Sequence, residues 1–164
     1  MSETVDGDVP ALAFECYEIP NSFFYEMAVR VGGHMDVVGG SRVFGGPEDA
    51  LMRAVLSLIA GDWQAWARFP AENDDHTMTL KMFSLRDGVD RNRLDYPCEL
   101  IWSEVDPHPH PVETRSLGVA PTVLQLARAI HAFGLGYYAG RKPSAALIAL
   151  SAALPAIEAA RPDH

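Results

Sequence analysis

Two histidines with one proline between them carry the clearest metal-binding chemistry in the chain. His108 and His110 lie between Asp106 and Glu113 in the stretch DPHPHPVE. Residues i and i+2 of an extended chain point the same way, and proline restricts the residue before it to extended conformations. The two imidazoles could therefore converge on one metal ion, with the two carboxylates adding oxygen ligands.

The same stretch is also typical of a stiff connector. Strong zinc signatures combine two spaced pairs of ligands, and this chain has one such pair, so His76 or His131 would have to join from afar. Prolines that alternate with polar residues form extended, polyproline-like segments. We therefore favour an exposed loop and expect no cofactor. A metal-binding domain or metal-dependent enzyme centred on His108 and His110 stays as the alternative.

A second candidate site is the aromatic and acidic stretch DWQAWARFPAENDD, residues 62–75. Tryptophan is over-represented in binding hot spots, and a neighbouring acidic rim attracts a basic partner. The alternative is that the aromatic rings complete the core while the acids only solvate a loop. The residues that we predict to bind a partner, two anchors and five acids, are Trp63, Trp66, Glu72, Asp74, Asp75, Asp87 and Asp90.

Motifs for nucleophilic catalysis and phosphate binding are missing from the sequence. There is no G-x-S-x-G, and Cys98 has no histidine near it in the chain. The glycine pairs match no phosphate-binding pattern, and GLGYYAG at 134–140 ends a helix, where the dipole repels phosphate. We expect a protein without catalytic residues.

The charge balance is acidic, with a formal net charge of −9. Nucleic-acid binding needs a basic stripe, so this composition argues against it and favours basic partners. Two cysteines make no disulfide framework, and the acidic start of the chain does not look like a signal peptide, which predicts a cytoplasmic protein. The apolar run 144–160 is shorter than the roughly 20 residues of a membrane span and contains Pro155.

Hydrophobic periodicity predicts one α+β domain over residues 1–164, with 1–10 as a flexible leader. We expect an antiparallel sheet of about five strands, in the order βββαββαα, with the helices packed on one face. The expected strands cover 12–19, 24–31, 37–46, 77–85 and 98–105, and the expected helices begin at Pro47, near residue 120 and at Ser144. Residues 62–69 are expected to form a short helix or turn.

Several positions within these elements have predicted roles. Gly39–Gly40 indicates a bulge or a close backbone approach, and Glu48 suits the positive end of the helix that begins at Pro47. Ser144 could cap the last helix. That helix is apolar nearly all round, so it is either central in the core or covered by a second subunit in a homodimer through 144–160.

The strands FYEMAVRV and VVGGSRVFGG are followed by the helix PEDALMRAVLSLIAGDW and the strand TMTLKMFSL. Over residues 12–105 this layout resembles that of small acidic immunity proteins, which bacteria carry beside polymorphic or contact-dependent toxins. The resemblance is one of layout and composition, and the helical C-terminal part departs from it. It implies a non-enzymatic, stoichiometric inhibitor of a toxin domain.

Together these features predict a cytoplasmic binding protein that occludes a basic partner, such as a toxin or nuclease domain. Two other functions stay open. One is the metal-dependent alternative at the histidine loop, and the other is a structural homo-oligomer that uses the last helix.

Overall fold

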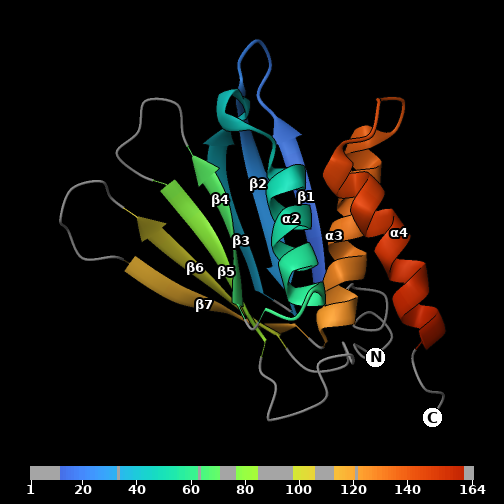
Figure 1. Ribbon diagram of the computed structural model, residues 1–164. Helices are drawn as coiled ribbons and strands as arrows, with labels where there is room; N and C mark the ends of the chain where they lie inside the picture. The colour runs from blue at the N-terminus through green and yellow to red at the C-terminus, as the bar shows by residue number, and fades with distance from the viewer. Residues whose placement is uncertain are drawn as a thin grey trace, which may run out of the picture.

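The computed structural model describes residues 12–32, 34–62, 64–70, 77–84, 98–105, 113–120 and 122–160, whose elements are shown in Figure 1. The predicted leader, residues 1–10, lies outside these ranges. Within them the chain forms seven strands and three α-helices, in the order βββαββββαα. The α+β class and the antiparallel pairing are confirmed, whereas the number of strands exceeds the five that we expected.

The first three strands form an antiparallel meander, as predicted. They are β1 (Leu12–Glu18), β2 (Phe24–Val31) and β3 (His34–Ser41), in the sheet order β1-β2-β3. Tyr25, Met27 and Val29 are buried, and they alternate with Phe24 and Glu26, which are exposed. This period of two gives the sheet one face toward the core and one face away from it.

Helix α2 (Pro47–Ile59) begins where the sequence predicted. Gly46 is the N-cap, Pro47 fills the first turn, and Glu48 and Asp49 lie at the positive end of the helix dipole. A short 3-10 turn, η1 (Arg42–Phe44), connects β3 to this helix. Residues 42–44 were expected to extend the third strand, but the Ser41 hydroxyl accepts a hydrogen bond from Val43 N and ends the extended backbone there.

The second sheet has the order β4-β5-β6-β7 and contains two strands that we did not predict. β4 (Gln64–Pro70) replaces the expected short helix or turn, and β7 (Glu113–Ala120) follows the histidine stretch. β5 (Thr77–Ser84) and β6 (Cys98–Val105) were predicted. In β4 the buried residues Ala65, Ala67 and Phe69 alternate with exposed Trp66 and Arg68, and this period of two outweighs the helical preference of alanine.

Helices α3 (Val123–Tyr138) and α4 (Ala145–Ala160) end the described chain. The Thr122 hydroxyl caps α3 by accepting a hydrogen bond from Gln125 N, and Ser144 accepts one from Leu147 N, which confirms the predicted cap. Leu147, Leu150 and Leu154 of α4 are buried, whereas Ile148 is 59% exposed. The last helix is therefore not central in the core. It covers α2 and α3 with one side only.

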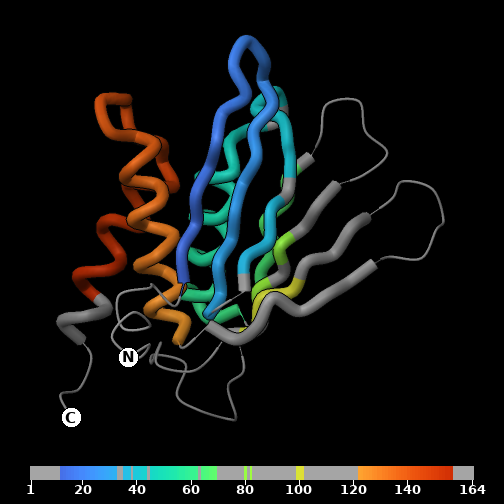
Figure 2. Tube along the Cα trace, turned by 180° about the vertical axis from the view of Figure 1, so that it is seen from behind, coloured from blue at the N-terminus to red at the C-terminus, as the bar shows by residue number. Residues whose placement is uncertain are grey.

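The helices form a layer on one face of the strands. α2 packs against β4, α3 packs against β1, and α4 lies over both helices as an outer layer. Figure 2, seen from behind, shows β1–β3 in blue to cyan in front of the green α2, and no helix of the described residues lies on their near side. Within the described residues, no helix is long and apolar enough to cross a membrane.

Candidate functional site

Arg42 organises a charged network where the β1–β2 hairpin meets α2. Its guanidinium donates to both carboxylate oxygens of Glu48, with Nη1–Oε1 and Nη2–Oε2 distances of 2.9 Å. Nε of Arg42 also donates to Glu18 Oε1 at 2.7 Å. The Glu48 side chain is 2% exposed and that of Glu18 is 53% exposed, so the two-pronged pair with Glu48 is the buried half of the network.

Gly46 leaves the space that this ion pair fills. A Cβ at Gly46 would lie 2.6 Å from Arg42 Nη1 and 2.8 Å from Glu48 Oε1, closer than real Cβ atoms approach their neighbours. Arg42 was not predicted as a site residue. The sequence contained one indication of the buried ion pair. Gly46 directly precedes Pro47, the first residue of the helix, and the second residue of the helix is the acid Glu48.

Tyr137 of α3 lies between two guanidinium groups. The Cζ atom of Arg42 is 4.4 Å from the centre of the Tyr137 ring, and that of Arg141 is 4.3 Å from it. Cation–π contacts of this length are attractive. Arg42 therefore connects three elements, because it pairs with β1 and α2 and stacks on α3.

The local environment keeps the neighbouring thiol neutral. Burial raises the pKa of Cys16 to about 11, with a further contribution from the Glu48 carboxylate and an opposing one from Arg42. For Arg42 itself, burial lowers the pKa, but the hydrogen bonds that it donates to Glu48 and Glu18 raise it by more. Since the thiolate is the nucleophilic form of cysteine, Cys16 is poorly suited to covalent catalysis.

A groove of about 690 Å³ runs between β1 and α3 beside this network. Five consecutive residues, Phe14 to Glu18, line its strand side. Ala132, Phe133, Gly136 and Tyr137 line its helix side, and Arg141 lies near one end with Tyr137. The Phe14 and Phe133 rings, with centroids 6.1 Å apart, hold the strand against the helix.

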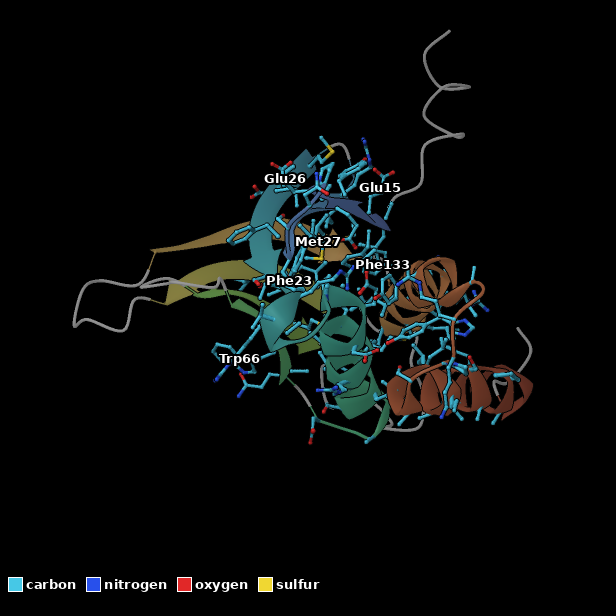
Figure 3. All side chains as sticks on the ribbon, turned by 90° about the horizontal axis from the view of Figure 1, so that it is seen from above. Glu15, Phe23, Glu26, Met27, Trp66 and Phe133 are labelled. Carbon is cyan, nitrogen blue, oxygen red and sulfur yellow. The ribbon has the colours of Figure 1, made fainter. Side chains whose placement is uncertain are left out.

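The outer face of β1–β3, on the side away from the helices, carries apolar side chains. Tyr17, Ile19, Phe24, Met35 and Val37 are exposed there, as the register of the three strands places them on one side. Phe23, which is 62% exposed, is two residues before the buried Tyr25, and Figure 3 shows it on the α2 side of Met27, so it does not belong to this face. Figure 3 shows Glu15 and Glu26 on the same side, pointing away from α2, while Met27 points inward.

Trp66 is the one predicted anchor that the described residues contain. It is 43% exposed on β4 and lines a second, smaller groove of about 340 Å³ with Asp49, Arg53 and Arg68. Two of these three charged neighbours are basic, whereas we expected an acidic rim. The predicted residues that fall outside the described part of the chain are Trp63, Glu72, Asp74, Asp75, Asp87 and Asp90.

The alternative metal site also falls largely outside the described ranges. Asp106, His108 and His110 are not among the described residues, and Glu113 is placed only as the first backbone position of β7. The described residues contain no group of three or more metal-ligating side chains. His131 is described, and it shares a 2.8 Å hydrogen bond with Ser151 that joins α3 to α4.

No protein-family model, curated protein or solved structure matches the chain.

Proposed function

We propose that this protein is a non-enzymatic binding module, whose outer face of β1–β3 covers a basic protein partner. One observation carries the proposal. Ten large apolar side chains are exposed among the described residues, and five of them lie on this face, namely Tyr17, Ile19, Phe24, Met35 and Val37. A solvated sheet face is usually polar, and exposed apolar patches mark interaction sites.

The acidic side chains on the outer face favour a basic partner. Glu15 and Glu26 stand on it, and Arg30 is the cation that the described residues place beside them. Arg30 Nη2 lies 3.6 Å from the sulfur of Met35, so its charge is held at one end of the face. With a net charge of −9 for the whole chain, the face complements a surface that is apolar at its centre and basic around it.

The hairpin that carries the exposed aromatics is held in place before any partner arrives. The Ser22 hydroxyl donates to Ile19 O at 3.0 Å and accepts from Phe24 N at 3.1 Å. Arg42 N donates to Phe23 O at 2.8 Å, which fastens the tip to η1. Ordered anchors lose less side-chain and loop entropy on binding, which favours tight association.

The role that we favour for this binding module is inhibition of a cytoplasmic toxin or nuclease domain. The acidic composition and the resemblance to small acidic immunity proteins support it, as does the raised pKa of the Cys16 thiol, which argues against thiolate chemistry at this site. A stoichiometric inhibitor needs a preformed surface and no reacting group.

Native mass spectrometry of the untagged protein from its own host tests this function. We expect a complex with one basic protein, lost in Met35→Ser and retained in Ile148→Ser, which removes a similarly exposed side chain from α4. The purified partner should lose its activity at one equivalent of the wild-type chain. A partner that Met35→Ser binds as well as the wild type does would remove the outer face from the proposal.

The apolar outer side of α4 supports a second candidate, a homodimer through 144–160. Ile148, Ala149, Ala152 and Ala156 are exposed on it, with no charged side chain among them. Sedimentation of the purified chain distinguishes the two. A dimer that Ile148→Ser converts to a monomer would favour the homo-oligomer, whereas a monomeric wild type would exclude it.

A further inference from the structure

The free edge of β1 is the feature of the fold that the proposed function leaves unused. In the described sheet order β1-β2-β3, β1 pairs with β2 on one side only. Unpaired strand edges attract further strands, so proteins usually cover or blunt them. The groove between β1 and α3 opens along this edge.

The register shows which backbone groups face the groove. Ile19 N donates to Phe24 O at 3.1 Å, so residues 19 and 24 form a hydrogen-bonded pair. Hydrogen-bonded and non-hydrogen-bonded pairs alternate along an antiparallel ladder. Tyr17, Glu15 and Ala13 therefore bond to β2. The backbone N–H and C=O groups of Phe14, Cys16 and Glu18 point away from β2, toward the groove.

Helix α3 forms the floor for a strand added at this edge. Figure 2 shows α3 beside β1, and the groove is lined by four residues of the helix that recur on one side of it, Ala132, Phe133, Gly136 and Tyr137. A Cβ built at Gly136 meets no atom within 4 Å, so a side chain from an added strand has room between the two aromatic rings.

The position of α3 also indicates whether the added strand comes from a second copy of this chain or from a different protein. If β1 of a second copy paired with this edge, the two-fold axis would bring the second α3 toward the first on the same side of the sheet. Because α3 already forms one wall of the groove, a strand that enters it must arrive without a helix of its own beneath it. An extended segment of a different protein meets this condition.

Charge and polarity define the chemistry of that segment. Its inward side chains would meet Phe133 and Tyr137, which favours apolar residues. Its outward side chains would stand beside Glu15 and Tyr17, and opposite charges on neighbouring strands attract. Glu15 and Tyr17 belong to both the groove and the outer face, so the two surfaces are continuous.

We propose that β1 takes up an extended segment of the partner as an additional strand, in which apolar residues alternate with lysine or arginine. Strand addition of this kind draws affinity from main-chain hydrogen bonds and specificity from alternate side chains. The inference rests on the proposed function, because the segment belongs to the partner bound at the outer face.

Amide hydrogen exchange measured by NMR tests the proposal with a capped heptapeptide of alternating valine and lysine. In the free protein we expect the amides of Phe14, Cys16 and Glu18 to exchange at least tenfold faster than those of Ala13, Glu15 and Tyr17. Peptide at millimolar concentration should slow the first three at least tenfold. An alternating valine and glutamate peptide, or the valine–lysine peptide N-methylated at alternate residues, should not.

Two variants that add the same side chain make the test specific to the groove. Gly136→Leu fills the floor at an exposed helical position and should abolish peptide binding, whereas Ala149→Leu on the outer side of α4 should leave it unchanged. Both variants are expected to fold, since neither new side chain enters the core.

Each other outcome would overturn the proposal. Peptide binding without the alternating protection, or no binding at 2 mM, would exclude strand addition. Protection in the free protein that rises with protein concentration would assign the edge to a second copy. A partner that is lost in Met35→Ser but kept by Gly136→Leu would leave the proposed function intact and remove the groove from it.

Discussion

Arg42 and Glu48 show how one ion pair determines the arrangement of a whole corner of the molecule. Burying a carboxylate is costly, and the cost is offset here by two hydrogen bonds from one guanidinium and by the positive end of α2. The same guanidinium stacks on Tyr137 and pairs with Glu18. One side chain thus holds β1, α2 and α3 around the groove.

Removing Arg42 should leave Glu48 as an unpaired buried carboxylate. We expect Arg42→Met to lower the free energy of unfolding by about 3–5 kcal/mol. The double variant with Glu48→Leu should recover much of that loss, because no charge remains buried. Glu18→Ala, at the exposed end of the network, should cost about 1 kcal/mol or less. Urea denaturation measures all three, and simple additivity of the Arg42 and Glu48 variants would show that the pair is not coupled.

The Cys16 thiol should react slowly near neutral pH. Its pKa of about 11 leaves little thiolate at pH 8. We expect alkylation by iodoacetamide to be at least about tenfold slower in the folded protein than in the unfolded chain. The rate should rise with pH up to about 11, and peptide-level mass spectrometry separates Cys16 from Cys98.

The raised pKa of Cys16 also makes the stability of the fold depend on pH. The fold favours the neutral thiol, so this group stabilises the folded protein fully below its ordinary pKa and loses that contribution as the pH rises through about 11. The free energies of unfolding of the wild type and Cys16→Ser should therefore differ by different amounts at pH 7 and pH 11. A difference that stays the same between these two pH values would contradict the raised pKa.

At the scale of elements, β2 and β3 fit together through a missing side chain. Tyr25 is opposite Gly40 in the register, and a Cβ on Gly40 would overlap the Tyr25 hydroxyl and lie 2.5 Å from its Cζ atom. The ladder runs through this pair without a shift in register. The predicted bulge is therefore absent from this pair of strands, and Gly40 makes room for the ring of Tyr25 where we expected the approach of a backbone.

Adjacent glycines of β3 should respond to alanine in opposite ways. Gly40→Ala forces a methyl group into the buried Tyr25 ring and should cost about 1–3 kcal/mol. At Gly39 the nearest atom to a new Cβ is Tyr25 O at 3.6 Å, so Gly39→Ala should be neutral or stabilise by up to about 1 kcal/mol. Thermal unfolding of the pair measures the difference, and equal midpoints would contradict the packing described here.

Across the whole molecule, the net charge of −9 and the apolar outer face of β1–β3 would act together in the proposed function. A negative protein speeds its encounter with a basic partner, and the apolar centre of the interface then slows dissociation. The net charge alone would attract any basic protein. The selectivity of the proposed binding therefore comes from the positions of Glu15 and Glu26 beside exposed apolar residues.

Association with the basic partner should therefore depend on salt and on where a charge lies. Glu26→Lys on the outer face should lower the association rate about tenfold at low ionic strength. Asp62→Lys, which changes the net charge equally at the turn after α2, should have a much smaller effect. Stopped-flow measurements at several salt concentrations test this, and equal effects of the two variants would mean that only net charge matters.

Hydrophobic periodicity by itself predicted much of the fold. Alternation in FYEMAVRV and the helical spacing after Pro47 reflect burial of one side of a single element, which local sequence records directly. β4 was missed because its buried positions are partly alanine, which is also a good helix former. In α3, Leu124 and Ala127 are buried, whereas Leu135 is 48% exposed.

The acidic balance follows from composition, the α+β class from hydrophobic periodicity, and the helix starts at Gly46 and Ser144 from neighbouring residues, so the sequence alone determines them. The Arg42 network, the groove beside β1 and the apolar outer face depend on which residues meet across the fold. Arg42 is 24 residues from Glu18 in the chain, and Tyr138 is 89 from the Asp49 that accepts its hydrogen bond. Only tertiary packing decides such contacts, because no local periodicity specifies which strand edge lies beside which helix.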